Sequence, residues 1–149
     1  MRAVVQRVSH AAIRVEGALI AEMGAGLVAL VGVARDDGPT QACELAERIV
    51  HLRIFPDAEG RMNRSLLETG GTLGVVSQFT LMGDARKGRR PAFTAAAPGP
   101  HAEPLVDALA GAARGLGVPV VTGRFGAQMQ IALRNEGPVT ILLDTERQF

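Results

Sequence analysis

The sequence places Gly137-Pro138 between two predicted β-strands, Met129-Gln130-Ile131-Ala132-Leu133-Arg134 and Val139-Thr140-Ile141-Leu142-Leu143. Proline cannot donate a hydrogen bond to a sheet ladder, and it fixes its own φ near about −65°. Glycine adds no side chain that would cover the neighbouring carbonyl groups. From the residues alone a trans peptide bond is favoured, because only about 5–6% of X-Pro bonds in folded proteins are cis. The junction therefore predicts a turn with exposed backbone carbonyls.

Two other Gly-Pro pairs stand where proline is routine. Gly38-Pro39 and Gly99-Pro100 each come shortly before a predicted helix, and proline is common at the start of a helix. Only Gly137-Pro138 interrupts consecutive strands. This position singles it out as a candidate for a special role.

The composition indicates one globular domain over residues 1–149. The chain has 149 residues, of which 47% are hydrophobic and only 3% aromatic. So few aromatic side chains argue against a series of base-stacking platforms, and a net charge of only +1 argues against a broad surface that coats nucleic acid. The single cysteine, Cys43, excludes an intramolecular disulfide and a Cys-based zinc site, and we expect it to be a buried, inert thiol.

We expect a cytoplasmic protein without a membrane span, a metal ion or another cofactor. The first residues have the pattern of a strand and lack the apolar segment of a signal peptide. The longest apolar stretch, residues 27–34, is much shorter than the roughly 20 residues that a membrane helix needs. The sequence has no His-x-x-x-His pair or acidic-histidine cluster of the kind that binds metals.

The order of elements predicts an α+β fold. Helices are expected over residues 40–52 and 101–116, where apolar residues recur at helical spacing. The other predicted strands cover residues 2–8, 11–16, 19–23, 27–33, 53–55, 73–81 and 118–122. Short turns between several strands favour antiparallel pairing. We therefore predict a single domain with a curved, barrel-like, largely antiparallel sheet and two main helices.

Ser77-Gln78-Phe79-Thr80-Leu81 is the first candidate for chemistry, because polar residues end a predicted buried strand. A Ser or Thr at this position is either a nucleophile, an oxyanion donor or a strand-end cap, and the residues alone do not distinguish these three roles. Ser77 lacks the flanking glycines of a nucleophile elbow. The three histidines, His10, His51 and His101, are each expected at the surface rather than in a catalytic triad.

Two further segments are candidates for binding. Arg86-Lys87-Gly88-Arg89-Arg90-Pro91 is the densest basic run, and it is either a solvated loop or a loop that contacts phosphates. Thr122-Gly123-Arg124-Phe125-Gly126 offers one aromatic ring that can stack on a base.

Together these segments resemble the D-aminoacyl-tRNA deacylase family over nearly the whole chain. The resemblance rests above all on two motifs at strand ends, Ser77-Gln78-Phe79-Thr80 and Gly137-Pro138-Val139-Thr140. Further matching segments are Ala3-Val4-Val5-Gln6-Arg7-Val8, Arg53-Ile54-Phe55-Pro56-Asp57-Ala58-Glu59-Gly60-Arg61-Met62-Asn63, Thr122-Gly123-Arg124-Phe125 and Asn135-Glu136. One departure is Ala92 before Phe93, where the family usually has Ser, so a hydroxyl role at that position is in doubt.

The resemblance implies a homodimeric hydrolase with its active sites at the dimer interface. Such enzymes cut the ester that joins a D-amino acid, or glycine mischarged on tRNA(Ala), to the terminal adenosine of tRNA. It also implies that the Gly137–Pro138 bond is cis, reaches into the partner's site and rejects L-aminoacyl-tRNA. Arg7 would hold this element, residues Ser77, Gln78, Phe79 and Thr80 would line the reaction centre, and Phe125 and Met129 would border the adenosine pocket.

Several alternatives stay open. The attacking group is the ribose 2′-OH or water, with the Phe79 and Thr80 backbone N–H groups binding the oxyanion, or it is the hydroxyl of Ser77 or Thr80. The chain is alternatively a module that binds aminoacyl-tRNA acceptor ends without cleaving them. A third interpretation is a structural homo-oligomer in which the Gly-Pro turn only packs.

Overall fold

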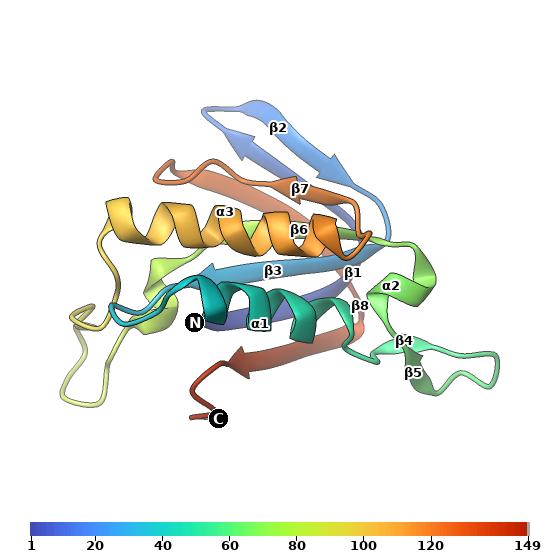
Figure 1. The fold of residues 1–149 in the computed structure, drawn as a ribbon. Coiled ribbons are helices and arrows are strands. Elements are labelled where there is room, and N and C mark those ends of the chain that lie inside the picture. Colours follow the sequence, from blue (N-terminus) through green and yellow to red (C-terminus); the bar gives the residue numbers. More distant parts are fainter. Residues whose placement is uncertain (149) are drawn as a thin grey trace.

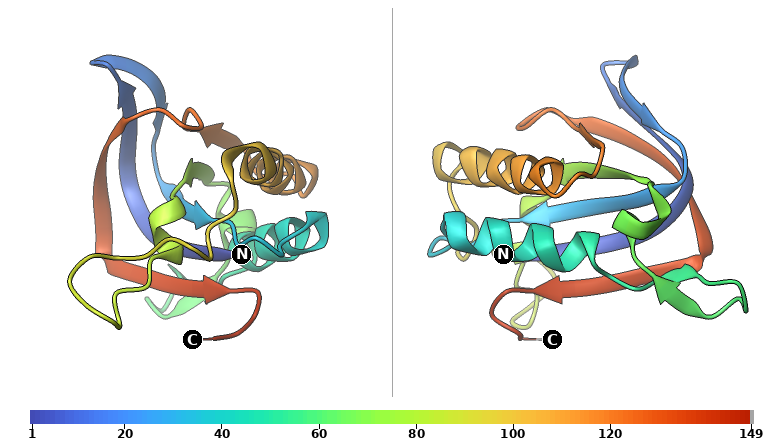
Figure 2. Two further views of the ribbon diagram at one scale, coloured as in Figure 1. Left: turned by 90° about the vertical axis from the view of Figure 1, so that its left-hand side faces the viewer. Right: turned by 45° about the vertical axis from the view of Figure 1, so that its right-hand side comes forward.

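The first and last strands are the longest elements, and they lie side by side. In the computed structural model, which describes residues 1–148, β1 (Arg2–Val15) pairs antiparallel with β8 (Met129–Asp144). Each was expected as two strands, and each is one strand with irregularities in its pairing. The first irregularity lies between the Gln6–Thr140 and Val8–Asn135 pairs, and it contains Gly137-Pro138. Figure 2 shows the two halves of β8 meeting at a corner.

The main sheet has the order β2–β1–β3–β6–β7, with β8 on the other edge of β1. Its remaining strands are β2 (Ala18–Met23), β3 (Gly26–Gly32), β6 (Thr72–Ser77) and β7 (Val120–Thr122). The curved, barrel-like α+β fold is confirmed, and the pairs made by β1 are all antiparallel. The sheet also contains two parallel pairs, β3–β6 and β6–β7, because the connections between these strands carry the two main helices.

The two predicted helices are confirmed within a few residues as α1 (Pro39–Val50) and α3 (Gly99–Gly115). They lie next to each other and cover one face of the sheet (Figures 1 and 2). The apolar residues of α1 that recur at helical spacing are all buried: Ala42, Leu45, Ala46, Ile49 and Val50. The main core therefore lies between this helical layer and the central strands.

The expected strand over residues 73–81 is wrong at its end. The last pair of the β3–β6 ladder joins Val31 to Ser77, and the Gln78 N–H still donates to the Val31 carbonyl over 2.7 Å. Beyond that point β3 ends, no ladder partner continues, and the chain turns into the 3-10 helix η1 (Phe79–Met82). The other small elements are β4 (Phe55–Pro56), β5 (Met62–Arg64) and α2 (Leu66–Thr69).

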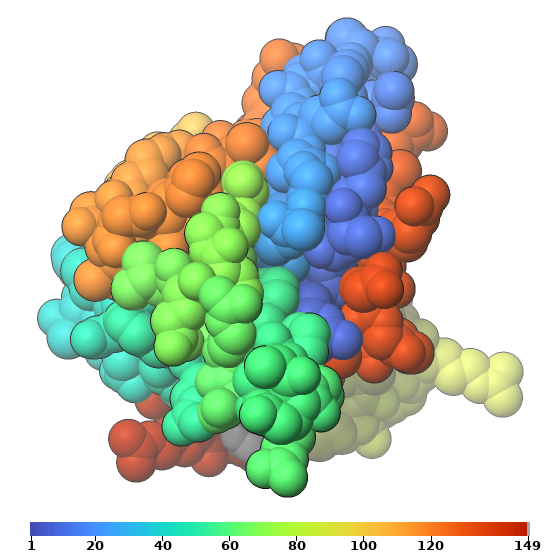
Figure 3. All heavy atoms as spheres, turned by 90° about the vertical axis from the view of Figure 1, so that its right-hand side faces the viewer, coloured from blue at the N-terminus to red at the C-terminus, as the bar shows by residue number. Residues whose placement is uncertain are grey.

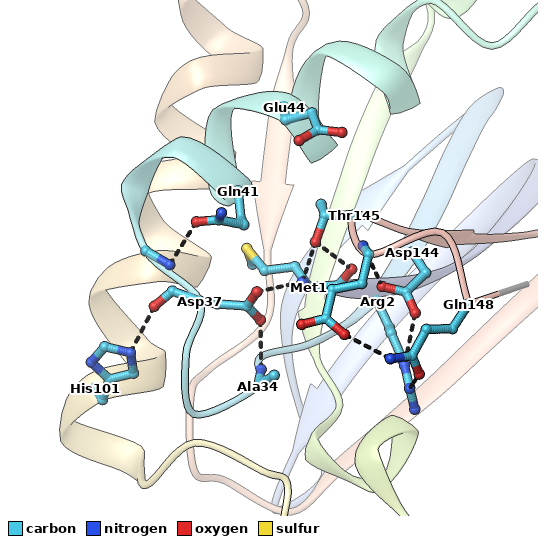
Figure 4. A network of polar contacts seen from close by, with 12 residues as sticks. Met1, Arg2, Ala34, Asp37, Gln41, Glu44, His101, Asp144, Thr145 and Gln148 are labelled. Carbon is cyan, nitrogen blue, oxygen red and sulfur yellow. Dashed lines mark hydrogen bonds and ion pairs between the residues drawn. The ribbon is translucent and has the colours of Figure 1, made fainter.

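A buried ion pair joins the start of β1 to the turn before α1 (Figure 4). The α-ammonium of Met1 lies 2.7 Å from Asp37 and donates to the Thr145 hydroxyl over 2.6 Å. The second carboxylate oxygen of Asp37 accepts from the Ala34 N–H, and the His101 ring contacts the Asp37 carbonyl at 2.9 Å. One network thus connects β1, α3 and the segment after β8.

No helix within residues 1–148 is long and apolar enough to span a membrane.

Candidate active site

A pocket of about 400 Å³ lies where the end of β6, the start of α3 and the start of β8 meet. Three of the predicted site residues, Ser77, Gln78 and Phe79, form one part of its wall, and Phe125 and Met129 form another. The remaining lining residues are Val31, Val33, Val76, Ala97, Gly99, Ala102, Val106, Gly126, Ala127 and Ile131. The fold therefore brings together residues that are about fifty positions apart in the sequence.

The pocket wall is electrically neutral and mostly apolar. All 15 described residues that line it are uncharged types, and only Ser77 and Gln78 have polar side chains. Such a site binds an aromatic or aliphatic group readily. Its polar contacts to a ligand come from backbone amides and from a few side chains.

The segment after β6 leaves the sheet at the edge of this pocket. Phe79 is 59% exposed, and Thr80 is exposed and lies outside the pocket lining. The Gln78 side-chain amide donates to the Thr80 hydroxyl. The backbone N–H groups of Phe79 and Thr80 stand at the open start of η1 and donate to no other group among residues 1–148. Two amide donors are thus free next to the pocket.

Met129 reaches the pocket because Gly123 leaves space for it. A Cβ atom added to Gly123 would lie 2.6 Å from the Met129 sulfur, closer than real side-chain contacts allow. The Gly123 N–H also donates to the Val75 carbonyl over 3.0 Å, which fixes the end of β7 beside β6. A side chain at position 123 would therefore displace Met129 from the pocket wall.

Gly137-Pro138 lies away from this pocket within the same chain. The bond is cis, and neither residue lines the pocket. Arg7, opposite it on β1, donates from Nε to the Glu136 carbonyl over 2.9 Å and from Nη1 to the Ile54 carbonyl. Gly137 has φ of +138°, and a Cβ atom there would lie 2.8 Å from a Val139 methyl group and 3.1 Å from Arg7 Nη2. Only glycine fits this backbone conformation and this space.

Sequence reasoning missed the part that Asn135 plays here. Its side-chain amide accepts from the Val139 N–H over 2.7 Å and donates to the Val139 carbonyl over 3.2 Å, and it also contacts the Thr140 hydroxyl at 3.1 Å. These bonds span the Gly-Pro segment from one end to the other. Asn135 stands inside a motif that the sequence makes recognisable, but only the fold shows what its amide contacts.

The three histidines lie outside the pocket lining. His10 is exposed and contacts Glu22 at 2.9 Å, His51 ends α1, and His101 contacts the Asp37 carbonyl. No group of three or more His, Cys, Asp or Glu side chains placed to hold a metal ion occurs within residues 1–148. Cys43 was expected to be buried, but it is exposed, because its position on α1 falls between the apolar residues that face the core.

Comparisons of the sequence with known proteins all point to the same family. The sequence profile of the D-Tyr-tRNA(Tyr) deacylase family matches residues 4–144. A D-aminoacyl-tRNA deacylase of Anaeromyxobacter dehalogenans is 56% identical over 149 residues, 100% of both chains. The protein of that name from Thermomicrobium roseum is 56% identical over 97% of this chain and 94% of its own, and that from Thermus aquaticus is 51% identical over 99% and 97%.

Two solved structures share the fold. The c-Myc DNA Unwinding Element Binding Protein superposes with a TM-score of 0.91 at 34% identity, covering 97% of this chain and 99% of its own. A probable eukaryotic D-amino acid tRNA deacylase superposes with a TM-score of 0.81 at 20% identity, covering 95% and 97%. At that lower identity the likeness concerns the fold alone.

Proposed function

Because this chain belongs to the D-Tyr-tRNA(Tyr) deacylase family, we propose that it cleaves the ester between a D-amino acid and the terminal adenosine of tRNA. It is a hydrolase, and two relatives that are 56% identical over 100% and 94% of their own length have the name D-aminoacyl-tRNA deacylase. The observation that carries the proposed chemistry is the neutral pocket with two free backbone amides beside it.

Because the pocket wall has no charged side chain among residues 1–148, we expect the attacking group to come from the substrate or from water and not from a side chain that a neighbouring base must deprotonate. An activated Ser or Thr nucleophile needs an adjacent base, and the described residues that line the pocket are all uncharged types. An aminoacyl ester is already activated and carries a ribose 2′-OH beside the scissile bond. We therefore assign the attack to one of two groups. Water attacks the ester directly, or the ribose 2′-OH attacks first and gives a 2′-ester, which a water molecule then cleaves; either route consumes one water and releases the amino acid.

The backbone N–H groups of Phe79 and Thr80 suit the next step. Attack on the carbonyl carbon puts negative charge on the carbonyl oxygen, and fixed amide donors stabilise such a charge without reorganising. The bond to the ribose 3′ oxygen then breaks, and that oxygen takes up the proton that the attacking water or 2′-OH gives up. Removing one donor of this kind costs about 10²–10³ in rate in other hydrolases.

Alanine variants separate this mechanism from covalent catalysis. S77A and T80A keep the backbone amides and remove only the hydroxyl groups, so both should hydrolyse D-aminoacyl-tRNA at near-normal rates. Complete loss in either variant would overturn the proposal in favour of a covalent route. A substrate with a 2′-deoxy terminal adenosine tests the 2′-OH: slow hydrolysis of it assigns the hydroxyl a part, and normal hydrolysis assigns the attack to water.

We assign the choice between D- and L-substrates to Gly137-Pro138 acting in the pocket of a second copy of the chain. Both residues are exposed and lie outside the pocket of their own chain, while Arg7 and Asn135 hold them in place. Enantiomers share charge and hydrophobicity, so discrimination requires a rigid steric obstacle against one Cβ direction. Each tenfold of discrimination corresponds to about 1.4 kcal/mol. A filter that reads the substrate backbone also accepts glycine, including glycine mischarged on tRNA(Ala).

Hydrolysis assays with D- and L-aminoacyl-tRNA, combined with measurement of mass in solution, test this assignment. We expect a dimer that cleaves the D-ester and spares the L-ester. A monomer that cleaves the D-ester and spares the L-ester would overturn the assignment of Gly137-Pro138 to the pocket of a second copy. If neither ester is cleaved faster than in buffer alone, the chain is a binder of acceptor ends and not an enzyme.

A further inference from the structure

We propose that the hairpin of residues 84–92 binds the phosphates that precede the terminal adenosine of tRNA, an inference that rests on the proposed function. The hairpin starts directly after η1 and is closed by two backbone hydrogen bonds between Asp84 and Ala92, of 2.8 and 2.9 Å. Ala92, which stands where the family usually has Ser, thus closes the hairpin through its backbone N–H and carbonyl groups. Figure 3 shows the segment, in yellow, projecting beyond the surrounding surface.

The hairpin concentrates positive charge in a chain that has little of it overall. It carries Arg86, Lys87, Arg89 and Arg90 against the single acid Asp84, whereas the whole chain has a net charge of +1. All four basic side chains are exposed. A local patch of this kind attracts a polyanion to one place on the surface.

The basic residues divide into one that is paired and three that are free. Arg86 forms a two-point ion pair with Asp84, with Nη2–Oδ2 and Nε–Oδ1 distances of 2.7 and 2.9 Å. This contact closes the base of the hairpin. Within residues 1–148, Lys87, Arg89 and Arg90 have no side-chain partner and keep their full donor capacity. Arginine suits phosphate because its planar guanidinium presents two parallel donors.

An aromatic pair connects the hairpin to the pocket. Phe93 follows the hairpin directly and packs edge-on against Phe79, with ring centroids 5.1 Å apart and an angle of 64° between the rings. Phe79 lines the pocket and is 59% exposed, so the pair marks the solvent edge of the pocket on the side of the hairpin. The hairpin that carries the free cations is therefore joined, through Phe93, to the edge of the site in which the terminal nucleoside is proposed to bind.

This arrangement fits a nucleic acid strand better than a small anion or an acidic protein. The described lining of the pocket itself has no charged side chain, so the pocket takes the end of a ligand that carries no phosphate, and the phosphates begin outside it. A tRNA acceptor end has this distribution, with an adenosine and an aminoacyl group at the tip and phosphates behind. The hairpin contacts carry affinity without sequence information, because phosphates are the same at every position.

The test compares R89Q/R90Q with R14Q/R114Q, which removes the same charge from exposed arginines on β1 and in the last turn of α3. Two substrates are used, D-aminoacyl-tRNA and a 3′-O-D-aminoacyl adenosine that has no phosphates. In R89Q/R90Q we expect kcat/KM to fall at least about tenfold more for the tRNA than for the adenosine ester. The plot of log kcat/KM against log salt for the tRNA should become shallower by about 1.4, at about 0.7 per single-strand phosphate contact.

Two results would overturn the proposal: an equal loss on both substrates, or the same loss in R14Q/R114Q. Binding of uncharged tRNA, measured for the same variants, separates this inference from the proposed function. If the unmodified chain cleaves neither D-ester, the proposed hydrolysis fails, and loss of tRNA binding only in R89Q/R90Q still supports the hairpin. If it cleaves both esters and R89Q/R90Q behaves like the control, only the inference about the hairpin fails.

Discussion

Arg7 on β1 donates its Nε–H to the backbone carbonyl of Glu136 over 2.9 Å, and this bond fastens the residue before Gly137 to the neighbouring strand. A second nitrogen of the same guanidinium donates to Ile54. One planar side chain therefore holds two separate backbone segments on either side of it. A lysine offers a point charge on a flexible stem and does not reproduce this geometry.

We expect Arg7→Lys to lower the ratio of D- to L-ester hydrolysis at least about tenfold, because a hydrogen bond to a charged group contributes about 1.5–3 kcal/mol. Initial rates with matched D- and L-aminoacyl-tRNA measure the ratio. Arg14→Lys, on the exposed end of the same strand, is the control. An unchanged ratio in Arg7→Lys would show that the Gly-Pro segment keeps its position without this arginine.

Asn135→Ala should loosen the Gly-Pro segment from within. The change removes the contacts to Val139 and Thr140, and each net hydrogen bond contributes about 0.5–1.5 kcal/mol. We expect a fall of about 1 kcal/mol or more in the free energy of unfolding in urea, together with a lower D-to-L ratio. Gln130→Ala, exposed on the same strand, should change neither quantity. Equal effects in the two variants would contradict a positioning role for Asn135.

Asp37→Asn should be among the most destabilising single changes. It removes the charge that faces the Met1 α-ammonium in an ion pair whose side chains are 0% and 3% exposed. Breaking a buried pair from one side costs about 3–5 kcal/mol, because the remaining charge stays buried without a partner. Urea denaturation measures the loss, and Asp36→Asn, at the exposed neighbouring position, is the control. A similar small loss in both variants would show that the Met1 charge finds water or another partner.

The Asp84–Arg86 pair should survive moderate acid. The side-chain and backbone hydrogen bonds from Arg86 hold the pKa of Asp84 well below its ordinary value of 3.8. A carboxyl group with a lowered folded pKa contributes stability that is present above its unfolded pKa and is lost as the pH falls through the folded one. The carboxyl carbon of Asp84 should therefore titrate below pH 3.8 in NMR spectra. Arg86→Gln should move the midpoint back toward 3.8, and an unmoved midpoint would contradict the pairing.

Cys43 should react with a thiol reagent in the native protein, because its side chain is exposed on α1. We expect one equivalent to react without denaturant, and Cys43→Ser to abolish the reaction. A thiol that reacts only after unfolding would show that this face of α1 is covered in solution, as by a second copy of the chain.

Local patterns predicted most of the elements correctly. Apolar spacing located α1 and α3, and the apolar run before Gly32 located β3. The predicted strand was wrong beyond Ser77 because the residues there do not show where the partner strand ends. The sequence also did not predict that β6 pairs in parallel with β3 and β7, because the partners of a strand depend on how the helical connections place segments that are distant in the sequence.

The sequence alone was enough to identify the family, because the two motifs that indicate it are short continuous segments. The sequence also marks Gly137-Pro138 as the one Gly-Pro pair between predicted strands. The folded chain was needed to show that Ser77, Phe79, Phe125 and Met129 share one neutral pocket and that Gly137-Pro138 lies outside it. The reason is that side-chain periodicity depends on neighbours along the chain, whereas the shape of a pocket depends on the curvature of the sheet and on contacts between residues far apart in the sequence.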